Sequence, residues 1–189
     1  MHKNLITQII GLVIEIILTS GLIIFFISSL VSSFYGSPYV PMTRKKVKSL
    51  FLFGALSQND IFFDLGCGDS RTLITAARDF NVKKAVGYDI SLFPYLKSLF
   101  SILISRTGKK VTVHRSNFLK ADISSATFIY LYLFPKIVDK LAYKLERETN
   151  VGTKILSASF PINLNGHPRI KLIKSEKFDK ITAYLYEKI

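Results

Sequence analysis

The sequence contains few of the residues that metal sites and disulfides require. Cys67 is its only cysteine, and its three histidines, His2, His114 and His167, are scattered along the chain. A lone cysteine forms neither an intrachain disulfide nor a Cys-x-x-Cys zinc site. We therefore predict no metal centre and no disulfide framework, and we interpret Cys67 as a small packing residue.

Acidic residues are also scarce, since 13 Asp and Glu against 26 Lys and Arg give a formal net charge of +13. Residues 1–36 hold only Lys3 and Glu15 as charged side chains, so the whole excess lies on residues 37–189. A basic domain attracts anionic lipid headgroups or nucleic acid. Because the chain shows no appended RNA-binding module, nucleic acid is the less favoured partner.

One long segment has almost no charge. Residues 5–30 contain no Lys, Arg or Asp, and Glu15 is their only charged side chain. As a helix the segment would span about 39 Å at about 1.5 Å per residue, and a bilayer core is about 30 Å thick. A signal peptide has a shorter apolar core, of about 7–15 residues. We therefore predict an uncleaved transmembrane anchor that contacts lipid through residues 5–31.

Glu15 conflicts with this anchor, because a carboxylate at mid-bilayer costs roughly 2.5–3.5 kcal/mol. In the favoured explanation the span lies at residues 11–31, which leaves Glu15 near one interface or protonated. The alternative is that Glu15 pairs with another membrane helix.

The flanking charges predict the orientation of the anchor. Lys3 precedes the apolar segment, and basic residues gather after it at Arg44, Lys45, Lys46 and Lys48. Positive residues stay on the cytoplasmic side. We therefore expect a single-pass membrane protein whose body faces the cytoplasm, or the matrix if the protein is organellar.

The body of the chain alternates apolar runs with helical patterns, which is typical of an α/β fold with a parallel sheet covered on both faces. We predict an anchor and linker at residues 1–36, with the linker proper at 32–41, and one domain at residues 37–189. The expected strands are 61–65, 85–90, 111–114, 127–133 and 154–160, with a closing hairpin of 169–175 and 181–187; the expected helices are 43–55, 71–80, 93–105 and 135–147.

The stretch "FFDLGCGDS" ends the first predicted strand. Gly66 and Gly68 then lie in the turn to the next helix, where glycine allows positive φ and close approach of a ligand. Asp64 ends this strand, and Asp89 ends the next one, where an acid accepts hydrogen bonds from ribose hydroxyls. One acid for an amine and one for a ribose fit S-adenosylmethionine (AdoMet). A tight turn with two incidental acids is the structural alternative.

Other nucleotides fit this stretch less well. Arg71 occupies the position of the last glycine of the dinucleotide motif GxGxxG, and Asp69 would bring negative charge toward phosphates. The Walker pattern GxxxxGK[ST] is absent.

Several motifs together resemble a known family. "DLGCGDS", "VGYDI" and "SNFLKADISSA" resemble the AdoMet motifs of class I methyltransferases. "PYVPMTRKKV", "AARDFNVKKAVGYDI" and "ADISSATFIYLYLF" resemble a narrower group of protein-lysine methyltransferases. That group includes archaeal broad-specificity enzymes and membrane-anchored mitochondrial enzymes that act on the ATP synthase c-subunit and the adenine nucleotide translocase.

The resemblance implies a Rossmann-like class I methyltransferase fold with a seven-stranded, mostly parallel sheet, a C-terminal antiparallel hairpin and one preceding transmembrane helix. It implies methyl transfer from AdoMet to a lysine of a protein, here expected to be a membrane protein. The matched positions are Tyr39 (closing over the cofactor pocket), Asp64, Gly66 and Gly68 (cofactor loop), Asp89 (ribose), and Asn117 with Phe118 (adenine).

The chain departs from the family in places that bear on the methyl acceptor. Relatives often have Gly where Ser70 stands, Thr-Pro at residues 42–43, and a His-Glu pair after the serine at 157. Tyr130 and Tyr132 share one face of a strand, and we predict that they line a channel for the acceptor lysine. The alternative is that they pack beneath a helix.

Other functions stay open from sequence alone. The chain lacks the (N/D)PP(Y/F) motif of adenine amino-group methylation. Methylation of RNA or of a lipid-like small molecule is a second hypothesis, and a non-catalytic AdoMet-fold membrane scaffold is a third.

Two predicted helices carry unusual surfaces. The helix at 43–55 joins basic residues to Phe51 and Phe53, and the helix at 93–105 is apolar nearly all round. We expect both to face the anchor, lipid or a membrane partner, which would hold the pocket near the membrane. The alternative is that a packed neighbour covers the second helix.

Overall fold

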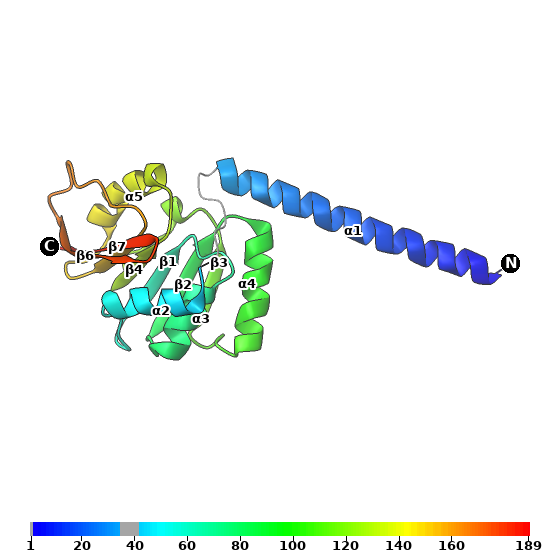
Figure 1. Cartoon of the computed structure of the whole chain (residues 1–189), viewed down its shortest axis with the longest axis horizontal. Helices are drawn as coiled ribbons and strands as arrows, with labels where there is room; N and C mark the ends of the chain where they lie inside the picture. The colour runs from blue at the N-terminus through cyan, green and yellow to red at the C-terminus, as the bar shows by residue number, and fades with distance from the viewer. Residues whose placement is uncertain (1, 35–41) are drawn as a thin grey trace.

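The computed structural model describes residues 2–34 and 42–189, and Figure 1 shows a long N-terminal helix projecting from an α/β domain. This helix, α1, extends over His2–Phe34. The predicted linker therefore begins later than residue 32, because α1 continues to Phe34. Tyr39 and the proposed boundary at residues 36 and 37 lie outside the described residues.

The domain is built on a seven-stranded sheet of order β3-β2-β1-β4-β5-β7-β6. The first five strands are parallel, and the last two form an antiparallel hairpin. This arrangement confirms the fold predicted from the sequence. The strands are β1 (Ile61–Leu65), β2 (Lys84–Asp89), β3 (Val111–Arg115), β4 (Phe128–Leu131), β5 (Lys154–Ala158), β6 (Ile170–Phe178) and β7 (Ile181–Lys188).

Helices cover both faces of the sheet, with one hydrophobic cluster on each face. One face carries α2 (Arg44–Phe53), α3 (Arg71–Asp79) and α4 (Leu92–Ser105), and the other carries α5 (Pro135–Glu148). A short 3-10 helix, η1 (Phe118–Lys120), follows β3. The strand order reverses between β1 and β4, and ligands of such sheets bind at the carboxyl ends of the strands beside that point.

Helix α2 packs against the sheet rather than toward lipid. It begins after Thr43, whose hydroxyl accepts a hydrogen bond from the Lys46 N–H at 3.4 Å. Phe51 is fully buried and its ring lies 5.0 Å from that of Phe62, and Phe53 is buried as well. The expectation that Phe51 and Phe53 face the membrane is therefore wrong, because both side chains belong to the core.

Helix α4, in contrast, agrees with the expectation of an uncovered apolar surface. Its large apolar side chains, among them Leu96, Phe100 and Leu103, are exposed, so no neighbour in the described structure covers the helix. Its first turn meets α1, since the rings of Phe25 and Phe93 lie 5.6 Å apart and nearly perpendicular.

None of the α1 side chains that the structure describes, at residues 5–27, belongs to either hydrophobic cluster. Its stretch Leu5–Ile27, 23 residues long and unburied, is long and apolar enough to cross a membrane. Glu15 lies well inside both ends of this stretch, whereas a span at residues 11–31 would place Glu15 near one end.

Candidate functional site

The loop after β1 follows a path that requires glycine. Gly66 has φ of +104° and Gly68 has φ of +54°, which L side chains rarely adopt. A Cβ atom at Gly66 would also lie 2.9 Å from Cδ2 of Leu133. The N–H groups of Gly66 and Cys67 donate to the carbonyl oxygen of Tyr88 at 2.8 and 3.0 Å, which ties the loop to β2.

Asp89 joins this loop from the end of β2. Its Oδ2 accepts a hydrogen bond of 3.0 Å from the Gly68 N–H, and its Oδ1 accepts one of 2.8 Å from the Ser91 N–H. Burial raises the pKa of this carboxyl, although these two hydrogen bonds and a third from the Ser91 side chain lower it. Each carboxylate oxygen has a second lone pair, so Asp89 keeps the capacity to accept hydrogen bonds from a ligand's hydroxyls.

Asp64 lies beneath the loop and is 2% exposed. Burial raises its pKa to about 7, and the charges of Asp89 and Asp69 add to the rise, while a hydrogen bond from the Thr72 hydroxyl opposes it. No cation contributes to this balance among the described residues. An ammonium group placed beside Asp64 would supply the missing positive charge, so the site fits the amine of an amino-acid nucleoside.

Asp69, in the same loop, has its charge paired with two basic side chains. It forms ion pairs with Arg71 at 2.7 Å and with Lys97 at 3.3 Å. Arg71 also donates to the carbonyl oxygen of Met42 at 2.6 Å. This network ties the loop, α4 and the chain before α2 together.

The residues expected beside the adenine lie after β3. Asn117 caps η1, because its Oδ1 accepts a hydrogen bond of 2.9 Å from the Leu119 N–H. Phe118 is partly buried against the cluster on the α5 face. On the neighbouring strand the ring of Tyr88 stacks on that of His114 at 5.2 Å. These side chains are therefore on the β2–β3 side of the loop.

The two candidate tyrosines lie at different depths. Tyr130 pairs with Asp64 across β1 and β4, is 2% exposed, and has its hydroxyl 4.0 Å from Sδ of Met42. Tyr132 is only partly buried and lines a cavity between the start of α2 and the β6–β7 turn. The other residues around that cavity are Met42, Thr43, Lys46, Ser159, Lys180 and Ile181.

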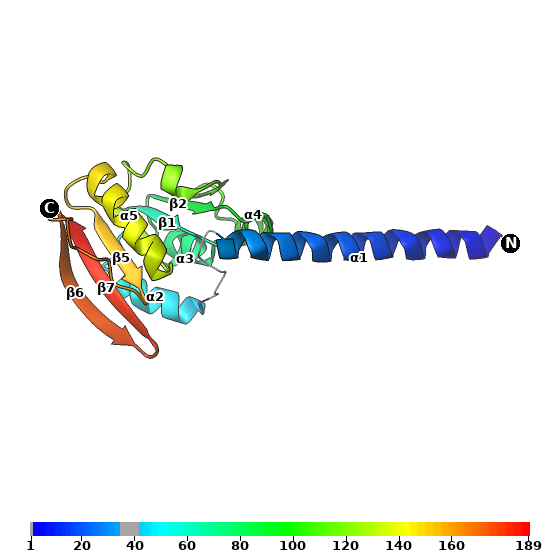
Figure 2. The ribbon, with the colours of Figure 1, turned by 90° about the horizontal axis from the view of Figure 1, so that it is seen from above.

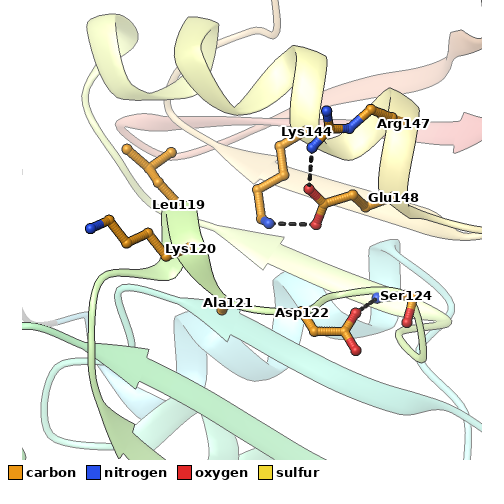
Figure 3. A pocket seen from close by; sticks show the side chains of 8 residues that line it. All are labelled: Leu119, Lys120, Ala121, Asp122, Ser124, Lys144, Arg147 and Glu148. Carbon is orange, nitrogen blue, oxygen red and sulfur yellow. Dashed lines mark hydrogen bonds and ion pairs between the residues drawn. The ribbon is translucent and has the colours of Figure 1, made fainter.

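A second cavity lies apart from the glycine loop after β1. It is formed between η1, the chain before β4 and the last turns of α5 (Figure 3). Among its charged side chains, Glu148 pairs with both Lys144 and Arg147. Asp122 accepts a hydrogen bond from the Ser124 N–H at 2.9 Å. None of the residues around it was predicted to bind the cofactor.

Cys67 is buried, and burial raises the pKa of its thiol well above the usual range. The side chain belongs to the hydrophobic cluster on the α2–α4 face, which confirms its interpretation as a packing residue.

The sequence did not reveal several neighbours of the site. Thr72 reaches Asp64, and Lys97 reaches Asp69, only because α3 and α4 fold back against the loop. The helical patterns identified both helices, and their position after successive strands was the one available signal. Lys180 lies in the turn of the closing hairpin, which the sequence predicts, but no pattern in the sequence places that turn beside Tyr132.

A family model described as the ANTKMT methyltransferase domain matches residues 64–166. The chain belongs to this family. The match begins at Asp64 and includes the glycine loop, Asp89 and Asn117, but not the start of α2 or the β6–β7 turn.

Individual relatives agree with this assignment. A protein-lysine N-methyltransferase of Saccharolobus islandicus is 39% identical over 150 residues, 79% of this chain and 92% of that protein. The adenine nucleotide translocase lysine N-methyltransferase of Mus musculus is 28% identical over 127 residues, 66% of this chain. The match spans only 54% of the mouse protein.

A solved structure supports the cofactor. An RNA methyltransferase from Salinibacter ruber, in complex with S-adenosyl-L-homocysteine, has a TM-score of 0.72 and 26% identity. The match covers 79% of this chain and 94% of that one. This ANTKMT family member is thus an AdoMet-dependent methyltransferase, which confirms both the resemblance and the cofactor inferred from the sequence.

Proposed function

We propose that this protein transfers a methyl group from AdoMet to lysine side chains of membrane proteins, while α1 anchors it in the bilayer. The observation that supports membrane anchoring is the apolar stretch Leu5–Ile27 of α1, whose described side chains take no part in the folded core. The name of the archaeal relative supports lysine as the acceptor.

AdoMet supplies a methyl group on a positively charged sulfonium, and the protein must bind and orient it. We assign the carboxylate of Asp64 to its amine and that of Asp89 to the ribose hydroxyls. Gly66 and Gly68 leave the backbone open to the ligand. From the family resemblance we assign Asn117 with Phe118 to the adenine, and Tyr39, which lies outside the described residues, to the closing of the pocket.

The cavity beside Tyr132 is the proposed entrance for the acceptor lysine. The lysine amine must be neutral to react, and its free pKa is about 10.4. Lys46 and Lys180 line this cavity, and Lys46 pairs with Asp179 at 3.2 Å. A positive charge at Lys180 would lower the pKa of an incoming amine. Tyr132 would position the amine, and the buried Tyr130 would form the floor beneath Met42.

The anchor sets the location in this proposal. Residues 1–36 form the anchor and linker, and residues 37–189 form the catalytic domain. The basic residues after α1, Arg44 to Lys48, favour a body on the cytoplasmic side, or the matrix side of an organelle. The net charge of +13 favours contact with anionic headgroups.

The test is to incubate the full-length protein, radiolabelled AdoMet and host membranes, and to identify labelled peptides by mass spectrometry. We expect methyl-lysine in integral membrane proteins. Label confined to soluble proteins would contradict the membrane part, and label on another residue type would contradict the acceptor. An Asp89→Ala variant, assayed at low AdoMet concentration where its weaker binding lowers the rate, serves as the control.

RNA methylation is a second candidate, because a protein 26% identical to this chain is named an RNA methyltransferase and the domain is basic. Digesting the labelled product with protease or with ribonuclease separates the two, since only the true acceptor's digestion releases the label. AdoMet binding without any labelled product would instead favour a non-catalytic scaffold.

A further inference from the structure

Helix α4 is amphipathic in the reverse sense to a surface helix. Its buried face consists of Pro94, Ser98 and Ile102, and the Ser98 hydroxyl hydrogen-bonds that of Ser70 in the cofactor loop. Its outward face is the apolar face of α4, which we define as Phe93, Leu96, Leu99, Phe100, Leu103 and Ile104. A helix normally buries such side chains and exposes its serines.

The apolar face of α4 is most exposed toward the end of the helix that lies away from α1. Leu103 is 74% exposed and Ile104 is 65% exposed, near the end of α4 away from α1. A contiguous apolar surface of this kind marks a contact with a partner or a membrane. The contact between Phe25 and Phe93 covers only the first turn, so it leaves the rest of the face in need of a partner.

The direction of α1 identifies that partner. Figures 1 and 2 show that α4 lies on the side of the domain from which α1 projects, and that it runs across the direction of α1. Phe25 belongs to the last turn of the apolar stretch Leu5–Ile27. If α1 crosses a bilayer, Phe93 therefore lies at the level where the hydrocarbon ends, and α4 lies in the plane of the interface.

We infer that the apolar face of α4 inserts into the bilayer interface as an in-plane helix, so that the domain is held at two points rather than by α1 alone. The occupant is lipid, and the inference rests on the proposed anchoring by α1. Arg106 and Lys109 follow the helix and are exposed, so they can reach anionic headgroups from its far end. Lys97, the charged residue within α4, pairs with Asp69 at 3.3 Å.

The chain offers a clean probe, because it contains no tryptophan. We would substitute Leu103→Trp in the full-length protein and reconstitute it in vesicles of equal amounts of phosphatidylcholine and phosphatidylglycerol. The matched control is Tyr143→Trp, at a position on α5 that is also largely exposed. Phe100→Trp provides a second reporter on the apolar face if Leu103→Trp folds poorly, and AdoMet binding checks folding.

We expect vesicles with brominated acyl chains to quench Leu103→Trp several-fold more strongly than Tyr143→Trp. Equal quenching in protein that floats with the vesicles would overturn the inference and leave the anchoring intact. Blue-shifted emission that bromolipid does not quench, and that is lost as the protein is diluted in lipid, would overturn it in favour of a second copy. Protein that fails to float would refute the anchoring and this inference together.

Discussion

The backbone N–H of Gly68 lies 3.0 Å from Oδ2 of Asp89 and donates a hydrogen bond to it, so the cofactor loop and the end of β2 are held as one unit. A change at Asp89 therefore affects both a proposed ligand contact and the shape of the loop.

Asp89→Ala should weaken AdoMet binding by tenfold or more. Hydrogen bonds to a charged group contribute about 1.5–3 kcal/mol, and about 1.4 kcal/mol corresponds to a factor of ten in affinity. Calorimetric titration measures the change. Glu176→Ala, which removes an exposed carboxylate on β6, is the control and should bind normally. Unchanged binding in folded Asp89→Ala would refute the ribose assignment.

AdoMet affinity should depend on pH through Asp64, whose pKa is raised to about 7 by burial. The ammonium of AdoMet needs an ionised partner, so affinity should fall by up to about tenfold per pH unit below 7. It should also fall above about pH 8, where an α-amino group loses its charge. Calorimetry from pH 5 to 9 measures both limbs, and Asp64→Asn should flatten the acidic one. An acidic limb that persists in Asp64→Asn would contradict the assignment.

The same carboxyl should destabilise the ligand-free fold at high pH. An unfolded Asp has a pKa of about 3.9, so the folded protein binds the extra proton between about pH 4 and 7, and stability is lost over that range as pH rises. Asp64→Asn should therefore raise the melting temperature at pH 8 and change it little at pH 4. The gain at pH 8 is at most about 4 kcal/mol, at about 1.4 kcal/mol per pKa unit. An equal shift at both pH values would show that charge is not its cause.

Gly87→Ala should destabilise the domain by about 1–3 kcal/mol. A Cβ atom there would lie 2.5 Å from Cδ1 of Leu73 and 2.7 Å from Sγ of Cys67, where the loop and α3 press on β2. Gly108→Ala is the matched control, because its nearest neighbour would be 3.8 Å away. Denaturant unfolding measures both variants, and equal stability of the two would disprove the close packing.

Much of the fold was predictable because its signals are local. β1 matches the predicted residues 61–65, since a run of apolar residues ends at Asp64 and Gly66. β4 ends at Leu131 rather than at residue 133, because pairing with β1 and β5 stops there. The sequence pattern could not predict that α4 is exposed or that Phe51 is buried. Apolar residues at helical spacing look the same in a sequence whether a neighbouring element covers them or not.

The site was predictable in its backbone and its acids but not in their partners. Asp64 and Asp89 end adjacent parallel strands, which brings them to one edge of the sheet. The hydrogen bond from Thr72 to Asp64 and the raised pKa depend on how α3 seats against β1. No short-range pattern encodes that seating.

Only three residues separate Asp89, at the cofactor loop, from Phe93, which touches α1. Four steps of chain reach no more than about 14 Å at about 3.6 Å per step. With α1 in a bilayer, this short connection would therefore hold the methyl donor in a shallow layer above the lipid. The height of a lysine above the membrane, rather than the sequence around it, would then select the substrate. One enzyme could therefore modify unrelated proteins that share only that height.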